Sequence, residues 1–212
     1  DTTNFKVQRQ LRQDLARSWP GTATVQLDSS QAISHTHYKP GGTGLLAIGP
    51  IASRLEPNGK QGDTLGRWSI MHFRRNQQAP VTVISAYQVC NTPTNAVGNT
   101  AWHQQKRALL HQGRDDHPRK AFIQDLIKLI QSFQANQHSI ILGGDFNETL
   151  EDSSSGLLRL VTATNLVDPW ITRHPNHATF KTQRYGSKRI DAIFVSPQLM
   201  PSITEIAYTP FE

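Results

Sequence analysis

The spacing of apolar residues alternates along the chain between a helical and an extended period. Val7, Leu11 and Leu15 recur every fourth residue, as on one face of an α-helix. Pro118 opens a second stretch of helical spacing, at a first-turn position where proline is tolerated. We expect helices over about 4–17, 102–112, 118–133 and 157–161. Short apolar or alternating runs predict strands over about 22–27, 45–48, 68–73, 81–87, 138–142 and 190–195.

Helices and strands interleave, which predicts the α/β class. The strands at 68–73 and 81–87 are joined by a short turn, so hairpins occur as well and the sheets should be mixed. The length of 212 residues favours a single domain over 1–212. A membrane span needs roughly 20 consecutive apolar residues, and no run approaches that, so we expect no membrane partner.

The chain carries an excess of positive charge. Lys and Arg number 22 against 16 Asp and Glu, a formal net charge of +6. Such a balance attracts polyanions, of which nucleic acid is a common one, although solubility alone explains the charge equally well. The single cysteine, Cys90, excludes an internal disulfide.

The strand predicted at 138–142 runs into Gly-Gly-Asp-Phe-Asn-Glu at 143–148. In extended backbone Asp145 and Asn147 share a face, so a carboxylate and an amide would point together beyond the strand end. The carboxylate can accept a proton from water or approach a hard cation, and the amide can donate to a phosphate. The alternative is an Asx-type turn that closes the strand, and the local sequence does not decide between the two.

Two further residues stand out by their positions at strand ends. Asp191 lies near the start of a late strand within the run Lys-Arg-Ile-Asp-Ala-Ile-Phe-Val-Ser, although aspartate is disfavoured in strands unless something fixes it. Tyr87 places a phenol at the end of the apolar strand 81–87. Taken singly, Asp191 would be a salt-bridge partner and Tyr87 an aromatic residue at the rim of a sheet.

Together and in this order, these segments resemble the endonuclease/exonuclease/phosphatase superfamily, which contains DNase I and exonuclease III. The resemblance extends from about residue 41 to 196 and rests on the Gly-Asp-Phe-Asn and Arg-Ile-Asp-Ala-Ile-Phe-Val-Ser runs. It implies a four-layer α/β sandwich with two mixed β-sheets flanked by helices, and cleavage of phosphoester bonds with Mg²⁺ or Mn²⁺. The residues between the motifs look most like endonuclease domains of retroelement polyproteins.

The resemblance also implies a role for each matching residue. Asp145 would orient or deprotonate the attacking water, and Asn147 would hold the scissile phosphate. Tyr87 would donate a hydrogen bond to a phosphate oxygen, and Asp191 would fix a catalytic histidine. Thr179 matches a position where family members place a hydroxyl against the phosphate. Independently of the resemblance, the positive charges of Lys188 and Arg189 at the start of the second motif favour contacts with the phosphates of DNA.

Two parts of the family pattern find no match in this chain. The early Asn and metal-binding Glu are missing, and so is the late Ser-Asp-His segment with its essential histidine. Both would lie at the ends, so we expect a fragment incomplete at its N- and C-termini, weakly active or inactive alone, with its metal ligands unassigned. The likeness to retroelement domains implies a parent protein that is fused to a reverse transcriptase and acts inside the cell, in the nucleus if the retroelement is eukaryotic.

Three functions remain open on this basis. The leading prediction is Mg²⁺-dependent hydrolysis of phosphodiester bonds in DNA. The second keeps the fold but acts on a phosphoinositide or sphingolipid head group. The third is a catalytically inactive domain that binds nucleic acid. The sequence does not indicate an oligomeric state.

Overall fold

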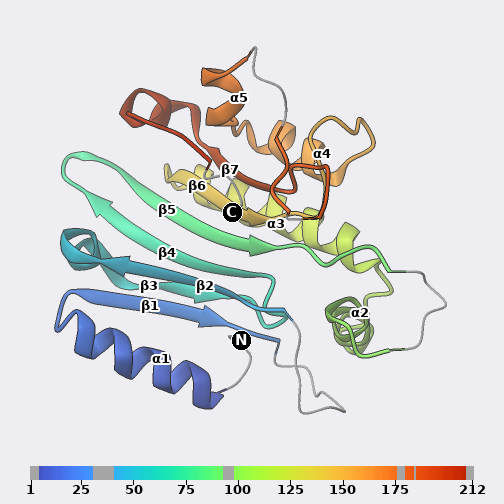
Figure 1. Cartoon of the computed structure of the whole chain (residues 1–212), viewed down its shortest axis with the longest axis horizontal. Helices are drawn as coiled ribbons and strands as arrows, with labels where there is room; N and C mark the ends of the chain where they lie inside the picture. The colour runs from blue at the N-terminus through green and yellow to red at the C-terminus, as the bar shows by residue number, and fades with distance from the viewer. Residues whose placement is uncertain (1–4, 31–40, 93–97, 176–179, 184, 209–212) are drawn as a thin grey trace.

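The structure, a computed structural model, describes residues 5–30, 41–92, 98–175, 180–183 and 185–208 (Figure 1). The chain begins with a helix that contacts the first strand of a small antiparallel sheet. These elements are α1 (Phe5–Ser18), β1 (Ala23–Asp28) and β2 (Thr43–Ile48). The predicted helix forms, but of the three residues spaced by four only Leu15 is buried, whereas Val7 and Leu11 are 43% and 38% exposed.

A five-stranded sheet forms the centre of the molecule, in the order β3-β4-β5-β6-β7. Its β5–β6 pair is parallel and the other three pairs are antiparallel, so this sheet is mixed, as predicted. The two-stranded sheet is antiparallel, and the expectation of two mixed sheets is corrected to one. The strands are β3 (Leu55–Gly62), β4 (Trp68–Arg75), β5 (Gln78–Tyr87), β6 (Ser139–Asp145) and β7 (Asp191–Val195).

Helices cover one face of the five-stranded sheet. Four helices and two 3₁₀ segments complete the described elements: α2 (Ala101–His111), α3 (Pro118–Ala135), α4 (Gly156–Thr164), α5 (Pro169–Arg173), η1 (Gly49–Arg54) and η2 (Pro197–Ser202). α3 packs on β6 and on α4, while β1 and β2 contact β4 from the opposite side. The predicted four layers are therefore present as α1, the small sheet, the large sheet, and α3 with α4 (Figure 1).

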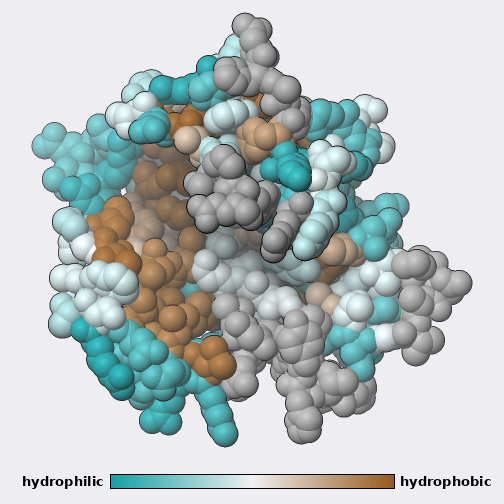
Figure 2. All heavy atoms as spheres, in the orientation of Figure 1, coloured by the Kyte–Doolittle hydropathy of each residue, from teal (hydrophilic) through white to brown (hydrophobic). Residues whose placement is uncertain are grey.

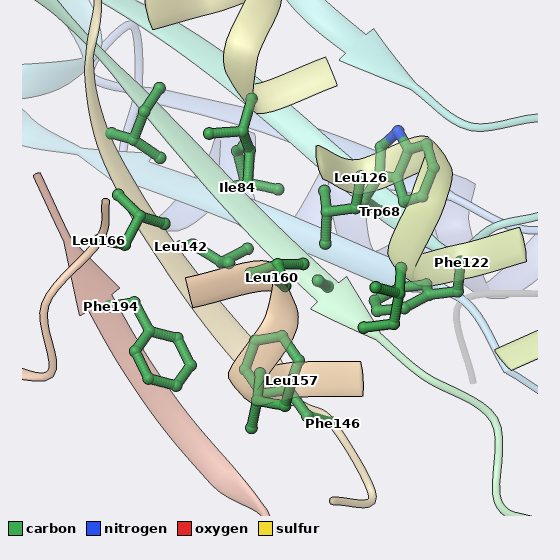
Figure 3. Packing of buried hydrophobic residues seen from close by; sticks show 14 of the residues in the cluster. Trp68, Ile84, Phe122, Leu126, Leu142, Phe146, Leu157, Leu160, Leu166 and Phe194 are labelled. Atoms are coloured by element: carbon green, nitrogen blue, oxygen red, sulfur yellow. The ribbon is translucent and has the colours of Figure 1, made fainter. Parts of the chain in front are cut away.

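The main core lies between the large sheet and the α3–α4 layer (Figure 3). Phe146, which follows β6, and Phe194 of β7 are fully buried, with ring centroids 5.5 Å apart in a T-shaped arrangement. Leu142 of β6, Leu126 of α3 and Leu160 of α4 belong to the same cluster. Because Phe146 is anchored in the core, its two polar neighbours along the chain are held at the rim of the sheet.

The opposite face of the large sheet is only partly covered. Ile193 of β7 is 47% exposed, and Figure 2 shows apolar atoms reaching the surface in a hollow on this side of the molecule. Ile193 alternates with buried Ala192 and Phe194, so its side chain lies on the face away from α3. The sheet therefore presents an open surface near β7.

Two elements differ from expectation for physical reasons. β3 is not predicted, because its sequence is mostly polar and contains Pro57 and Gly59. Such a sequence is tolerated at the sheet edge, where β3 lies with an irregular register against β4. The short α5 is also missed, and its start is fixed by Asp168 as N-cap. Within the described part of the chain, no helix is both long and apolar enough to span a membrane.

Candidate active site

Three of the predicted site residues form one row across three adjacent strands. Tyr87 is the register partner of Asp145 in the parallel β5–β6 pair, and Asp145 is the partner of Asp191 in the antiparallel β6–β7 pair. Register partners project from the same face of a sheet, and in antiparallel pairs their Cβ atoms are about 4.5–5.5 Å apart. The structure thus brings together residues that are far apart in the sequence.

The row lies on the sheet face that carries the exposed Ile193. Ala86 and Ala192 belong to the core on the α3 side, so the side chains that alternate with them point the other way. Tyr87 packs against a small cluster formed by Val89 and by Ala101 and Trp102 of α2. A Cβ on Gly41 would lie 3.5 Å from the Tyr87 ring, so the phenol is flanked by backbone on that side.

Asn147 reaches the same end of the sheet through a turn. Its backbone N–H donates to Oδ1 of Asp145 at 3.0 Å, and its φ is 48°, a left-handed conformation that asparagine tolerates. The strand therefore ends at Asp145. The extended geometry assumed for this pair is wrong, and the Asx-type turn is the one that forms.

The Asn147 amide joins the segment that follows β5. Its Nδ2 donates to the carbonyl of Gln88 at 2.7 Å, and the Cys90 thiol donates to its Oδ1 at 3.3 Å. Among the residues that the structure describes, one of the two Nδ2 hydrogens is used in this way, which leaves the other for an outside acceptor. The side chain is thus held in one orientation beside the carboxylate of Asp145.

Further hydrogen bonds join the segment after β5 and the segment after β6 to the helices. Arg119, in the first turn of α3, donates to the carbonyls of Val89 at 2.5 Å and Asn147 at 3.1 Å, and to Oε1 of Glu148 at 2.6 Å. The other oxygen of Glu148 accepts from the backbone N–H of Leu157 at 2.8 Å. Sequence reasoning missed both Arg119 and Glu148. Arg119 lies at the start of a predicted helix and Glu148 at the end of the Gly-Gly-Asp-Phe-Asn-Glu run, but nothing in the sequence indicates that these two residues pair.

The electrostatics of the row depend on burial and on like charge. Burial raises the pKa of Asp145 above its ordinary value, and the neighbouring carboxylate of Asp191 raises it further. The hydrogen bond from the Asn147 N–H and the charge of Arg119 act in the opposite direction. A carboxylate whose pKa is raised is a better proton acceptor and gains more from a nearby cation.

The two carboxylates suit a hard divalent cation. Mg²⁺ prefers oxygen ligands and is usually held by one or two carboxylates, with water and substrate phosphate completing its shell. Asp145 and Asp191 supply such a pair. In the part of the chain that the structure describes, no group of three or more His, Cys, Asp or Glu residues could hold a metal ion. Asp145 and Asp191 are thus the two carboxylates that would hold such a cation, with water and substrate completing its shell.

The remaining predicted residues have different surroundings. Thr179 lies outside the described residues. Lys188 is exposed beside the start of β7. Arg189 is only 7% exposed: its guanidinium pairs with Asp168 at 2.6 Å and contacts the Tyr208 hydroxyl at 3.2 Å. The assignment of Arg189 to substrate is therefore corrected, because a guanidinium buried against a carboxylate serves the fold and is not presented to a ligand.

Thr182 positions the start of β7 and was not predicted. Its hydroxyl oxygen accepts hydrogen bonds from the backbone N–H groups of Ile190, at 2.9 Å, and Asp191, at 3.0 Å. Its own N–H donates to the carbonyl of Lys188 at 3.1 Å. These bonds close a loop before β7 and fix the backbone from which the Asp191 carboxylate projects.

No family model and no curated protein matches the chain. Among solved structures, beta toxin from Staphylococcus aureus is 14% identical over 93% of this chain and 70% of its own, with a TM-score of 0.48. TDP2 from C. elegans is 11% identical over 88% of this chain and 50% of its own, with a TM-score of 0.49. The human Nocturnin catalytic domain is 13% identical over 91% of this chain and 65% of its own, with a TM-score of 0.49. The chain thus spans half to about two thirds of these two proteins. Likenesses at this level concern the arrangement of the chain and carry no argument about activity.

Proposed function

We propose that the chain hydrolyses phosphodiester bonds in nucleic acid with the help of Mg²⁺ or Mn²⁺. The observation that carries this proposal is the row of Tyr87, Asp145 and Asp191 across β5, β6 and β7, with the Asn147 amide held beside it. Displacement at phosphorus depends on a positioned water and on neutralised charge more than on covalent chemistry. A phenol, an amide and two carboxylates at one sheet end supply these requirements.

Each residue has a role that follows from its environment. Asp145, with its raised pKa, orients the attacking water and takes its proton. The unused Nδ2 hydrogen of Asn147 and the Tyr87 hydroxyl donate to oxygens of the scissile phosphate. Asp145 and Asp191 would hold the cation, which neutralises charge on the phosphoryl group when bound. The role of Asp191 in fixing a histidine, implied by the family resemblance, stays a prediction.

Charge favours nucleic acid as the substrate. The net charge of +6 and the exposed Lys188 beside β7 suit a polyanion that extends beyond the scissile bond. A phosphoinositide or sphingolipid head group presents fewer phosphates to such a surface. An origin in a retroelement, with fusion to a reverse transcriptase, stays a prediction that the open reading frame on both sides of this segment would check.

Plasmid nicking by the wild-type chain and by Asp145→Asn tests the proposal. With protein in excess over supercoiled DNA, so that weak activity is measurable, we expect slow nicking in Mg²⁺ or Mn²⁺, none in EDTA, and a decrease of at least about 100-fold in the variant, because a proton acceptor is worth about that much or more. Undiminished nicking by Asp145→Asn would contradict the assignment. DNA binding without nicking would indicate a binding domain, and phosphate release from a soluble phosphoinositide alone would indicate the head-group alternative.

A further inference from the structure

A cavity of about 970 Å³ lies on the helical side of the candidate site. It opens between the N-terminal ends of α3 and α4, which lie side by side (Figure 1). Arg119 and Glu148, which fix the loop that carries Asn147, form part of its wall. The cavity and the candidate site thus share the segment that follows β6. The rest of the wall includes His117, Lys120, Ile123, residues 153–156, Leu158, Arg159 and Ala163.

The charge on the cavity wall is positive. Glu148 neutralises Arg119 in an ion pair of 2.6 Å. Lys120 and Arg159 are exposed, and neither side chain forms an ion pair with any other residue that the structure describes. Burial lowers the pKa of His117, and so do the nearby charges of Arg119 and Lys120 among others, which is the effect expected of a positive field. Two cations therefore face the cavity without protein counter-charges.

These cations occupy unfavourable positions for the helices that carry them. The N-terminus of a helix is its positive end, where acidic residues stabilise and basic residues destabilise by about 0.3–1 kcal/mol each. The first turns of α3 and α4 contain no acidic residue, and Lys120 and Arg159 lie in or next to them. Helix stability does not explain this choice of residues. At α4 the Glu148 carboxylate already accepts from the Leu157 N–H, so an anion bound between the two helix ends would be favoured by both cations and by the N-terminus of α3.

We propose that this cavity binds the sugar-phosphate backbone of the nucleic-acid strand next to the scissile bond. Lys120 and Arg159 contact its phosphate groups, and the apolar wall of Ile123, Leu158 and Ala163 accommodates a sugar or base. The cavity is far larger than one phosphate ion, and its shared wall with the Asn147 loop places it along the strand that enters the candidate site. This inference rests on the proposed function and deepens it, because the substrate becomes an extended strand.

Binding of a fluorescein-labelled single-stranded DNA oligonucleotide in EDTA, followed by anisotropy over a range of NaCl concentrations, tests the cavity without hydrolysis. The double variant Lys120→Ala/Arg159→Ala should bind about tenfold more weakly at low salt. The slope of log K against log[salt] should fall by about 0.7 for each phosphate of the single strand that the variant no longer neutralises. Lys120→Arg/Arg159→Lys should retain most of the affinity, since both charges remain.

Lys128→Ala is the matched control, because Lys128 is an exposed cation on the same helix but outside the cavity. It should change neither the affinity nor the slope. The double alanine variant should not unfold at a lower temperature than wild type, because it removes cations from positive helix ends. A lower melting temperature would show that the two side chains serve the fold.

Two results would overturn the proposal. One is DNA binding with unchanged affinity and salt slope in the double alanine variant. The other is that the double alanine variant binds DNA as wild type does but loses binding to phosphatidylcholine vesicles that contain a phosphatidylinositol bisphosphate. That result would assign the cavity to a lipid head group. Neither result depends on hydrolysis, whereas undiminished nicking by Asp145→Asn would refute the catalytic site whatever the cavity binds. The two failures are therefore distinguishable.

Discussion

Asp145 and Asp191 lie directly opposite each other on the antiparallel strands β6 and β7. Like charges directly across a strand pair destabilise a sheet, so nothing in the fold itself favours this arrangement. The backbone around Asp191 is nevertheless fixed by the Thr182 hydroxyl, and that around Asp145 by an Asx turn. Two acidic side chains are thus held together against the repulsion expected of like charges, as is common where a site is organised for function.

This repulsion predicts a pH dependence of stability. The pKa of Asp145 is raised in the folded state by burial and by Asp191. Protonated Asp145 therefore contributes to the free energy of unfolding in full at pH values below its unfolded pKa. This contribution is lost as the pH rises through the folded pKa. Asp145→Asn stays neutral and escapes that loss. Urea denaturation should therefore show the variant to be more stable than wild type at pH 7, with the difference vanishing below about pH 4.

Asp125→Asn provides a control of opposite sign. Burial raises the pKa of Asp125, but hydrogen bonds from Arg114 and Arg67 outweigh it and the net pKa is lowered. Its stabilising contribution is therefore present above the unfolded pKa and lost as pH falls through the folded pKa. Asp125→Asn should be less stable than wild type at pH 7. An Asp145→Asn protein that is also less stable at pH 7 would contradict the raised pKa.

The two glycines before Asp145 should respond differently to alanine. A Cβ at Gly144 would overlap the carbonyl of Ala86 on β5, whereas a Cβ at Gly143 would make an ordinary contact of 3.5 Å with Ile193. Gly144→Ala should cost about 1–3 kcal/mol through backbone displacement and should impair nicking, because β5 carries Tyr87. Gly143→Ala should be neutral or stabilising by about 0.5–1 kcal/mol. Chemical denaturation of the two variants checks this, and equal losses would contradict it.

The sequence predicts the three site residues that lie at strand ends. Tyr87, Asp145 and Asp191 each lie at the end of a strand that apolar spacing predicts, so their convergence follows once β5, β6 and β7 are neighbours. The order of the strands was not readable from spacing and came from the resemblance of the motifs. The edge strand β3 is not predicted from its sequence, because its residues are mostly polar and its stability depends on pairing with β4.

The spacing of residues along the sequence does not predict contacts between residues that are far apart in the chain. The pairing of Arg119 with Glu148 needs α3 to lie against the end of β6, and no local feature specifies it. Lys188 and Arg189 look alike in the sequence, as two cations before a strand. Alternation along the chain places one in solvent and the other in the interior, where Asp168 is its partner.

Arg119 should be a positioning residue for Asn147. Arg119→Gln removes the ion pair with Glu148 and leaves that carboxylate, 19% exposed, without its cation. Because both groups retain some contact with solvent, we expect a loss toward the lower end of about 3–5 kcal/mol. Adding Glu148→Gln should recover part of it, since no unpaired charge remains. The double-mutant cycle, measured in urea, gives the coupling, and additive losses would contradict a direct pair.

The contrast between Lys188 and Arg189 gives the last test. Arg189→Met removes a guanidinium that is buried with Asp168, with 6% and 5% of the two side chains exposed, so it should cost about 3–5 kcal/mol by leaving an unpaired buried carboxylate. Arg189→Met/Asp168→Asn should lose less, because the buried charge is removed as well. Lys188→Ala, at an exposed side chain, should change stability by less than about 0.5 kcal/mol.

DNA binding should separate the same two residues in the opposite way. Lys188→Ala should weaken binding at low salt and reduce the salt slope, because an exposed cation beside the site is free to neutralise a phosphate. Arg189→Met/Asp168→Asn removes the buried charge pair, so its DNA affinity and salt slope should equal those of wild type under conditions where both proteins are folded. A reduced salt slope for folded Arg189→Met/Asp168→Asn, with none for Lys188→Ala, would restore Arg189 as the phosphate contact and would show that the side chain leaves Asp168 to bind DNA.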